Sequence, residues 1–219
     1  ECKTKDQDIW SLLDISKPSF LPCSYTIVLD TVENMLSDAI EHKNFPILKI
    51  KVNNENIEPI LTGIRSKLPQ VKIIIDANEG FTLDTLKENM PIFEKTKIDL
   101  IEQPLSPKHD DQLLDFVSPI PICADESFHT ISDFDEVSKK YGAISIKLDK
   151  TGGLSEALII ANKAKKKDKI IMLGCMVATS LSLLPALSLY KYADFIDLDG
   201  PCFLKQDRKD GIKYENGKM

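Results

Sequence analysis

Lysines and acids recur at the ends of short apolar runs in this chain, and these residue types can bind a metal ion or transfer protons. In chain order the motifs are Lys49-Ile50-Lys51, Asp76-Ala77-Asn78, Glu102-Gln103-Pro104, Asp125-Glu126-Ser127, Lys147-Leu148-Asp149 and Asp197-Leu198-Asp199. Each motif alone has a plain structural explanation, because a carboxylate after a strand is commonly a helix cap or a loop residue. Their ordered recurrence points instead to one shared site.

The elements that would position these motifs are strands and helices in alternation. We expect strands at the apolar, β-branched runs 24–29, 48–52, 72–76, 99–102, 122–125, 143–148, 170–174 and 195–199. Amphipathic stretches at 32–42, 57–67, 83–93 and 154–164 are expected as helices. The run Ile73-Ile74-Ile75 is apolar on both faces, as expected of a strand covered by helices.

Eight strands with helices between them fit either a doubly wound open sheet or a closed barrel. An open sheet that binds nucleotides would carry a glycine-rich turn after its first strand, but Asp30-Thr31 stands there and no GxGxxG or Walker motif occurs. The even spacing and the number of strands favour a parallel, TIM-like (β/α)7β barrel in an α/β fold.

Composition excludes several classes of protein. The net charge of −6 and the pI near 5.2 argue against nucleic acid and anionic membranes as partners. No apolar run is long enough for a membrane-spanning helix, and the charged segment 1–8 does not resemble a signal peptide. The five cysteines are scattered, with no CxxC motif, which favours reduced thiols in a cytoplasmic protein.

The three acids Asp76, Glu102 and Asp125 would meet at one end of the barrel. They are the last residues of three consecutive predicted strands, and the active site of such a barrel lies at the C-terminal ends of its strands. Unpaired, their charges would repel and raise their pKa values, whereas a hard divalent cation relieves the repulsion. Mg²⁺ suits such oxygen ligands.

Two lysines would flank the substrate of such a metal. Lys49 and Lys51 point to the same face of their strand, and Lys147 lies on a predicted strand four places further around a ring of eight. Lys51 and Lys147 would therefore face each other across the barrel mouth. Removing a proton next to a carboxylate creates an enediolate, which a metal ion and ammonium groups stabilise. Lys49 would lower the pKa of Lys51, and two opposed bases give the geometry of a racemase or epimerase.

The ordered motifs resemble the enolase superfamily, within its muconate-lactonising subgroup, over about residues 24–201. The resemblance implies that Asp76, Glu102 and Asp125 bind Mg²⁺ and that Lys51 and Lys147 are the two bases. It further implies that Lys49 modulates the pKa of Lys51, and that Asn78 and Glu126 lie next to the metal ligands without binding the metal themselves.

The pair Asp197 and Asp199 is similar to the DxD motif of dipeptide epimerases, in which the two acids hold the ammonium of the dipeptide. Two carboxylates on one face suit such a cation, although Asp199 could instead cap the turn at Gly200. The resemblance implies a Mg²⁺-dependent epimerase that inverts the α-carbon of a dipeptide's C-terminal residue by two-base 1,1-proton transfer through an enediolate. The alternatives are an N-acylamino-acid racemase, an o-succinylbenzoate synthase, a cycloisomerase, or a non-catalytic barrel that needs a partner chain.

The two ends of the chain are expected to lie outside the barrel. We assign residues 1–20 to a helix and linker from an N-terminal capping domain that is absent here, 21–200 to the catalytic barrel and 201–219 to a return segment. The pairs Asp210-Gly211 and Asn216-Gly217 predict hairpin turns, and hence antiparallel strand, in this last segment. We also expect a homo-oligomer, a small dipeptide as substrate, a core position for Cys175, and a tight turn at Gly152-Gly153.

Overall fold

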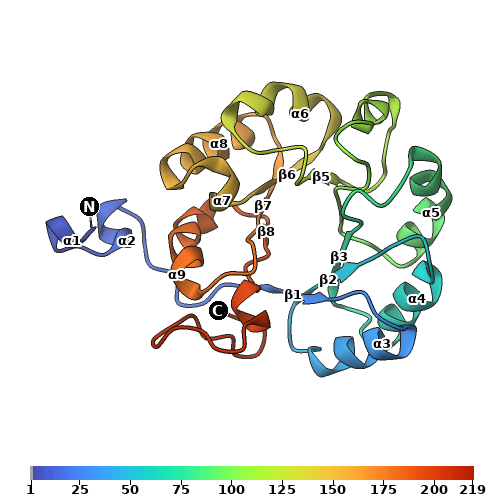
Figure 1. Cartoon of the computed structure of the whole chain (residues 1–219), viewed down its shortest axis with the longest axis horizontal. Coiled ribbons are helices and arrows are strands. Elements are labelled where there is room, and N and C mark those ends of the chain that lie inside the picture. The colour runs from blue at the N-terminus through green and yellow to red at the C-terminus, as the bar shows by residue number, and fades with distance from the viewer. Residues whose placement is uncertain (1) are drawn as a thin grey trace.

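Eight parallel strands form a nearly closed barrel surrounded by helices (Figure 1). The computed structural model describes residues 2–219. The strands are β1 Ser24–Ile27, β2 Ile47–Lys51, β3 Lys72–Asp76, β4 Leu100–Glu102, β5 Ile122–Ala124, β6 Ala143–Ile146, β7 Ile170–Leu173 and β8 Phe195–Ile196. Each strand pairs in parallel with the next one along the chain, which confirms the predicted α/β barrel.

The seam between β8 and β1 is bridged by side chains. Within residues 2–219 no backbone ladder joins these two strands. Instead, the Ser24 hydroxyl donates to Asp197 Oδ1 at 2.5 Å and the Thr26 backbone N–H donates to Asp199 Oδ2 at 2.7 Å. The two aspartates thus complete the barrel where main-chain pairing stops.

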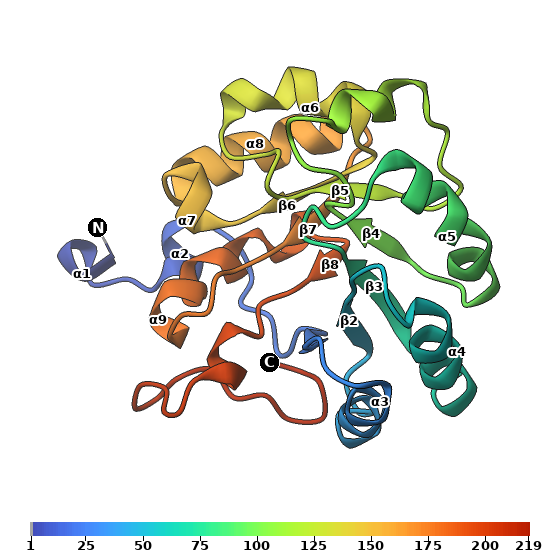
Figure 2. The same ribbon diagram turned by 45° about the vertical axis from the view of Figure 1, so that its right-hand side comes forward.

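Helices cover the outside of the barrel (Figure 2). They are α3 Val32–Glu41, α4 Ile57–Lys67, α5 Leu83–Lys95, α6 Phe134–Lys140, α7 Leu148–Thr151, α8 Leu154–Lys166 and α9 Ser180–Leu183, with 3-10 segments η1 Asp110–Asp115, η2 Ile131–Asp133, η3 Leu184–Tyr192 and η4 Gly200–Phe203. Threonines cap two of the helices, since Thr31 accepts from the Asn34 N–H and Thr82 from the Thr85 N–H. The link from β4 to β5 differs from expectation, because it contains only the 3-10 segment η1.

The predicted strands are present but most end earlier than expected. Residues 147 and 148 leave β6, where Lys147 is the N-cap of α7, and Asp197 and Asp199 lie beyond β8. At these ends the backbone turns to present charged side chains instead of continuing the ladder. The turn at Gly152-Gly153 is confirmed, with φ values of 79° and 114° between α7 and α8.

The interior of the barrel has an apolar floor. A buried cluster, called here the floor cluster, takes one inward-facing residue from each of seven strands: Ile47, Ile74, Leu100, Cys123, Ala143, Met172 and Phe195. Two residues further along the same strands stand charged groups such as Lys49, Asp76 and Glu102. Since side chains alternate across a strand, these groups lie on the same inward face, above the floor. The other face packs beneath the helices in the main core.

The ends of the chain pack outside the barrel. Residues 2–20 contain only two short helices, α1 Cys2–Lys5 and α2 Ile9–Leu12. The antiparallel strand predicted in 201–219 is wrong, since this segment makes only isolated bridges, Pro22 with Lys218 and Glu215 with Lys218. The turn at Asn216-Gly217 does occur, with positive φ at both residues. In the described part of the chain, no helix has the length and apolar character needed to cross a membrane.

Candidate active site at the barrel mouth

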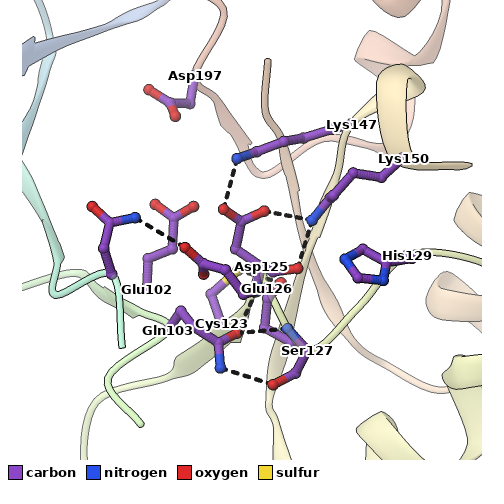
Figure 3. A network of polar contacts seen from close by, with 12 residues as sticks. Glu102, Gln103, Cys123, Asp125, Glu126, Ser127, His129, Lys147, Lys150 and Asp197 are labelled. Carbon is purple, nitrogen blue, oxygen red and sulfur yellow. Dashed lines mark hydrogen bonds and ion pairs between the residues drawn. The ribbon is translucent and has the colours of Figure 1, made fainter. Parts of the chain in front are cut away.

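A pocket of about 560 Å³ opens at the C-terminal ends of the strands. Its lining includes Lys49, Lys51, Asp76, Asn78, Asp125, Glu126, His129, Lys147, Lys150, Cys175, Asp197 and Asp199. Every residue predicted for the site therefore lines this pocket except Glu102, which lies buried beside it. Figure 3 shows the side of the pocket formed by β4, β5 and β6.

Lys49 is the buried cation at the centre of the acids. Its Nζ lies 3.0 Å from Asp76 Oδ2, 2.5 Å from Glu102 Oε2 and 2.8 Å from Asp197 Oδ2. Burial alone would lower the pKa of Lys49, but the charges of these three acids raise it well above its usual value. Lys49 therefore keeps its positive charge among the acids.

Lys51 lies above Lys49 and is partly exposed. Its Nζ donates to Asp76 Oδ2 at 2.7 Å and to Asn78 Oδ1 at 2.5 Å, and the Asn78 amide in turn donates to Glu126 Oε1 at 3.0 Å. Although burial raises the pKa of Asp76, the charges of Lys49 and Lys51 hold it well below its usual value. Asn78 thus contacts both the lysine and an acid, because its backbone N–H also donates to Asp76 Oδ1 at 3.0 Å, whereas Glu126 reaches Lys51 only through Asn78.

Lys147 and Lys150 share Asp125 on the opposite side of the pocket. Lys147 Nζ lies 2.6 Å from Asp125 Oδ2, and Lys150 Nζ lies 2.5 Å from Oδ1 (Figure 3). Burial raises the pKa of Asp125, but the two ammonium groups hold it below its ordinary value. For Lys147, burial lowers the pKa, but the charges of Asp125 and Glu102 and the hydrogen bond to Asp125 together raise it, so the net direction is upward. In this ion pair Lys147 does not have the lowered pKa expected of a base.

Glu102 is the most unusual of the acids, because it is fully buried and neither of its oxygens accepts a hydrogen bond. The contact from Lys49 is close but poorly aligned for one. Burial raises the pKa of Glu102 well above its usual value, and the charge of Asp76 adds to the effect. A buried carboxylate without hydrogen bonds is costly, so this site favours an additional positive charge beside Glu102.

The acids fit a divalent cation by charge and chemistry. Within residues 2–219, no three acidic, histidine or cysteine side chains are arranged as a metal-binding group, since each acid turns toward a lysine. Around the pocket, however, carboxylates outnumber lysines: Asp76, Glu102, Asp125, Glu126, Asp197 and Asp199 stand against Lys49, Lys51, Lys147 and Lys150. The unsatisfied oxygens of Glu102 and this excess of oxygen ligands match what Mg²⁺ requires.

Asp197 and Asp199 lie together at the seam between β8 and β1. The side chain of Asp197 contacts Lys49 and Ser24, whereas in the described part of the chain the side chain of Asp199 bonds only to the Thr26 N–H. Burial and the charge of Asp197 raise the pKa of Asp199 from 3.8 to about 6. Asp199 is the N-cap of η4 but makes no side-chain cap bond, so the turn-capping explanation does not apply.

Gly174 leaves room for Lys147. A Cβ at this position would lie 2.7 Å from Ser145 Oγ and 3.0 Å from Lys147 Cε. These separations are shorter than ordinary van der Waals contact, so the absence of a side chain at the end of β7 lets the lysine reach the pocket.

Sequence reasoning missed several residues of the pocket. Lys150 and His129 line it, and Cys175 is partly buried at its wall, not simply part of the core. Burial raises the pKa of the Cys175 thiol to about 12, which argues against a nucleophile. Lys150 could have been found by its spacing, because it stands one helical turn beyond Lys147. No local signal marks His129.

The fold and the site together define a class of protein, the parallel barrels that carry acids and lysines at the C-terminal ends of their strands. Residues 31–219 match the family model described as "Enolase C-terminal domain-like". The chain therefore belongs to the enolase superfamily, as the ordered motifs predicted.

Two curated relatives are similar over most of the chain. The N-acetyl-D-glutamate racemase of Pseudoalteromonas sp is 41% identical over 90% of this chain and 62% of its own length. The L-Ala-D/L-Glu epimerase of Escherichia coli (strain K12) is 34% identical over 99% of this chain and 68% of its own. The chain thus spans about two thirds of the length of these relatives.

Solved structures show the same similarity. An L-Ala-D/L-Glu epimerase superposes with a TM-score of 0.94 at 34% identity, covering 99% of this chain and 69% of the other. A dipeptide epimerase from Cytophaga hutchinsonii, complexed with Mg and the dipeptide D-Ala-L-Val, has a TM-score of 0.87 at 26% identity and covers 95% and 61%.

Proposed function

We propose that this chain is the barrel of a Mg²⁺-dependent isomerase that inverts the α-carbon of the C-terminal residue of a dipeptide. The observation that carries the proposal is the placement of Lys51 and Lys147 in one pocket, at the end of β2 and directly after β6, with the acids between them. The curated racemase and epimerases to which the chain is similar support this class of reaction.

The two lysines exchange a proton with opposite faces of the α-carbon. The neutral form of one lysine removes the proton, and the ammonium form of the other donates a proton to the other face. Both Nζ atoms hydrogen-bond to acids, Lys51 to Asp76 and Lys147 to Asp125, which fixes their positions. Withdrawing Asp125 from Lys147, as metal binding would do, removes the contact that raises the pKa of Lys147.

Asp76, Glu102 and Asp125 would hold the Mg²⁺. The support from this chain is the fully buried, unsatisfied carboxylate of Glu102 and its electrostatic coupling to both aspartates. When bound, the ion neutralises the negative charge that develops on the substrate carboxylate. Lys49, held between the acids, supplies further positive charge at the same place.

Asp197 and Asp199 would recognise the substrate ammonium. Asp199 is the better placed of the two, because only one of its side-chain oxygens has a partner among the described residues, the Thr26 N–H, whereas both oxygens of Asp197 already have partners. Asp197 already contacts Lys49, so it would contribute mainly negative potential.

Racemisation of an N-acylated amino acid is the second candidate function. It is favoured by the 41% identity to the N-acetyl-D-glutamate racemase. An N-acyl substrate carries no ammonium, so this reaction would not need the negative charge of Asp197 and Asp199. The two candidates therefore differ in what they demand of these two residues.

We further propose that a capping domain or partner chain covers the pocket, with residues 1–20 as linker, 21–200 as barrel and 201–219 as return segment. The rim exposes Val28, Met176, Val177 and Phe203, an unusual concentration of apolar side chains around a polar site. The greater length of the relatives agrees with this proposal. A homo-oligomeric state and a cytoplasmic location remain predictions.

Proton NMR in D₂O tests the proposed chemistry. The chain is incubated with Mg²⁺ and a mixture of dipeptides, and the α-proton signals of the C-terminal residues are followed. We expect these signals to be lost, and Lys51→Ala or Lys147→Ala to abolish the loss. Unchanged signals with every dipeptide would contradict the proposal for this chain acting alone.

A paired substrate assay separates the two candidates. The double variant Asp197→Asn, Asp199→Asn is compared with the wild type on L-Ala-L-Glu and on N-acetyl-L-glutamate. A dipeptide epimerase should lose turnover of the dipeptide, whereas an N-acylamino-acid racemase should keep most of its activity toward the acylated substrate.

A further inference from the structure

We infer that Gln103 is a positioning residue that sets the spacing of the three proposed metal ligands, and that a buried chain of hydrogen bonds from Lys140 holds its amide in place. This inference rests on the proposed metal site and names a residue that acts on it without contacting the metal. It is carried by the hydrogen bonds that surround Gln103.

Main-chain pairing between β4 and β5 stops just before Asp125. The Ile101 N–H donates to the Pro121 carbonyl and the Gln103 N–H to the Cys123 carbonyl. In this parallel pattern the Asp125 N–H would next donate to the main-chain carbonyl of Gln103. That carbonyl is turned away, because Gln103 adopts a left-handed backbone conformation with φ of 32°.

The side chain of Gln103 replaces the missing carbonyl. Its Oε1 accepts from the backbone N–H of Asp125 at 2.8 Å and from that of Ser127 at 3.1 Å. The main-chain carbonyl, freed from β5, accepts from the Glu79 N–H at 2.9 Å in the loop that follows Asp76. Gln103 thus joins the loops after β3 and β5, and it is bonded covalently to Glu102.

The orientation of the Gln103 amide is set by a buried polar chain, of which Figure 3 shows the contact between Gln103 and Ser127. Its Nε2 lies within 2.9 Å of Leu105 O, Ser127 Oγ and Tyr141 OH. Because the Ser127 and Tyr141 hydroxyls accept from this amide, both can donate their own protons to Asp110 Oδ2, at 2.7 Å and 2.9 Å. The amide cannot flip without placing donors against donors.

Asp110 anchors the far end of this chain. It is almost completely buried, on η1, and its other oxygen accepts from Lys140 Nζ at 2.6 Å. The link from β4 to β5 therefore holds a 3-10 segment whose acid completes the network, in place of the expected helix. Fully satisfied buried networks of this kind rigidify their surroundings.

The test compares three variants with the wild-type chain. Gln103→Met removes the amide, Tyr141→Phe removes one hydroxyl of the network at nearly constant volume, and Thr96→Val is the control. Thr96 is equally buried, but its hydroxyl bonds to the Ile92 carbonyl at the end of α5, outside the pocket. Each protein is examined by thermal unfolding, Mg²⁺ titration calorimetry and amide hydrogen exchange.

We expect Gln103→Met to raise the Mg²⁺ dissociation constant about tenfold or more, and Tyr141→Phe to raise it less. Thr96→Val should leave the Mg²⁺ dissociation constant unchanged, even if this variant loses as much melting temperature as Gln103→Met does. Amide exchange at Asp125 and Ser127 should be slow in the wild type and fast in Gln103→Met. Should Gln103→Met fail to fold, Tyr141→Phe carries the same test.

The two readouts separate this inference from the proposed function. Rapid exchange of the Asp125 and Ser127 amides in the wild type, or Mg²⁺ affinity unchanged in folded Gln103→Met and Tyr141→Phe, would overturn the role of Gln103. Slow exchange of these amides together with no Mg²⁺ binding by the wild type would support the hydrogen bonds of Gln103 to Asp125 and Ser127 and would reject the proposed metal site.

Discussion

The floor and the mouth of the barrel are built from the same strands, yet they obey opposite rules. On β2 the inward residues run from Ile47 through Lys49 to Lys51, and on β3 from Ile74 to Asp76. The floor buries only apolar groups, whereas the mouth buries charges that bind one another at 2.5 to 3.0 Å. Burying such charges is unfavourable even when they are paired. The floor therefore stabilises the fold, whereas the charged mouth costs stability and supplies the side chains of the candidate site.

The floor and the mouth also differ in which substitutions they should tolerate. Apolar contacts are non-directional, so the floor should tolerate other apolar residues of similar volume. The mouth depends on individual atoms, since Lys49 Nζ touches three different acids. Substitutions should therefore separate stability from activity along a single strand.

The largest expected effect is the loss of either proposed base. Lys147→Ala or Lys51→Ala should lower the rate of α-proton exchange by about 10³-fold, the usual scale of general acid–base catalysis. The rate is measured by NMR in D₂O. Lys72→Ala is the matched control, because Lys72 begins β3 at the floor end, with its Nζ 5.4 Å from the Phe195 ring centroid. Equal losses in all three variants would erase the distinction between mouth and floor.

Truncating the floor should have the opposite result. Met172→Ala removes a fully buried side chain of the floor cluster and should lower the free energy of unfolding by about 2–5 kcal/mol. The folded variant should bind Mg²⁺ as the wild type does, because no contact in the mouth is changed. Urea unfolding and titration calorimetry measure the two effects. Weakened metal binding with unchanged stability would contradict this division.

A smaller effect is expected at the end of β7. Gly174→Ala places a methyl group against Ser145 and Lys147 and should displace the lysine. A shift of this kind should reduce activity by roughly 10- to 100-fold. Gly142→Ala is the matched control, since a Cβ there meets nothing within 4 Å. Full activity in Gly174→Ala would contradict the prediction, because it would show that the added methyl group does not displace Lys147 from the position that activity requires.

The smallest effect concerns pH. The pKa of Asp199 is raised to about 6 in the folded chain, so the folded state binds more protons than the unfolded state between about pH 4 and 6. The stabilisation is present at low pH and is lost as the pH rises through 6, by on the order of 1–3 kcal/mol. Chemical unfolding between pH 4 and 7 measures the slope of the free energy of unfolding against pH.

Asp199→Asn serves as the control for this pH effect, because the amide keeps the shape of the side chain and does not titrate. The variant should lose the part of the slope between pH 4 and 6. If the slope is identical in the wild type and in Asp199→Asn, the pH dependence of stability comes from other acids in the mouth.

Much of the fold could be predicted because its signals are local. The alternation of apolar runs and amphipathic stretches predicted eight strands, and the helix expected at 32–42 is present as α3, with Thr31 as its cap. The expected antiparallel strand in 201–219 was wrong, since turn residues do not establish what pairs on either side of a turn. In place of an α-helix between β4 and β5 stands the 3-10 segment η1, whose Asp110 accepts hydrogen bonds from residues far along the chain.

The sequence by itself determined which residues meet at the mouth, because strand order and the two-residue alternation of side chains bring Lys51, Asp76, Glu102 and Asp125 to one end. Only the tertiary structure decided what each contacts. The bonds from Ser24 and Lys49 to Asp197 join residues 173 and 148 positions apart, and the side-chain oxygen of Gln103 replaces its own main-chain carbonyl as the acceptor for the Asp125 N–H. Such contacts depend on distances of a few tenths of an ångström between distant segments, and no local pattern of residues encodes them.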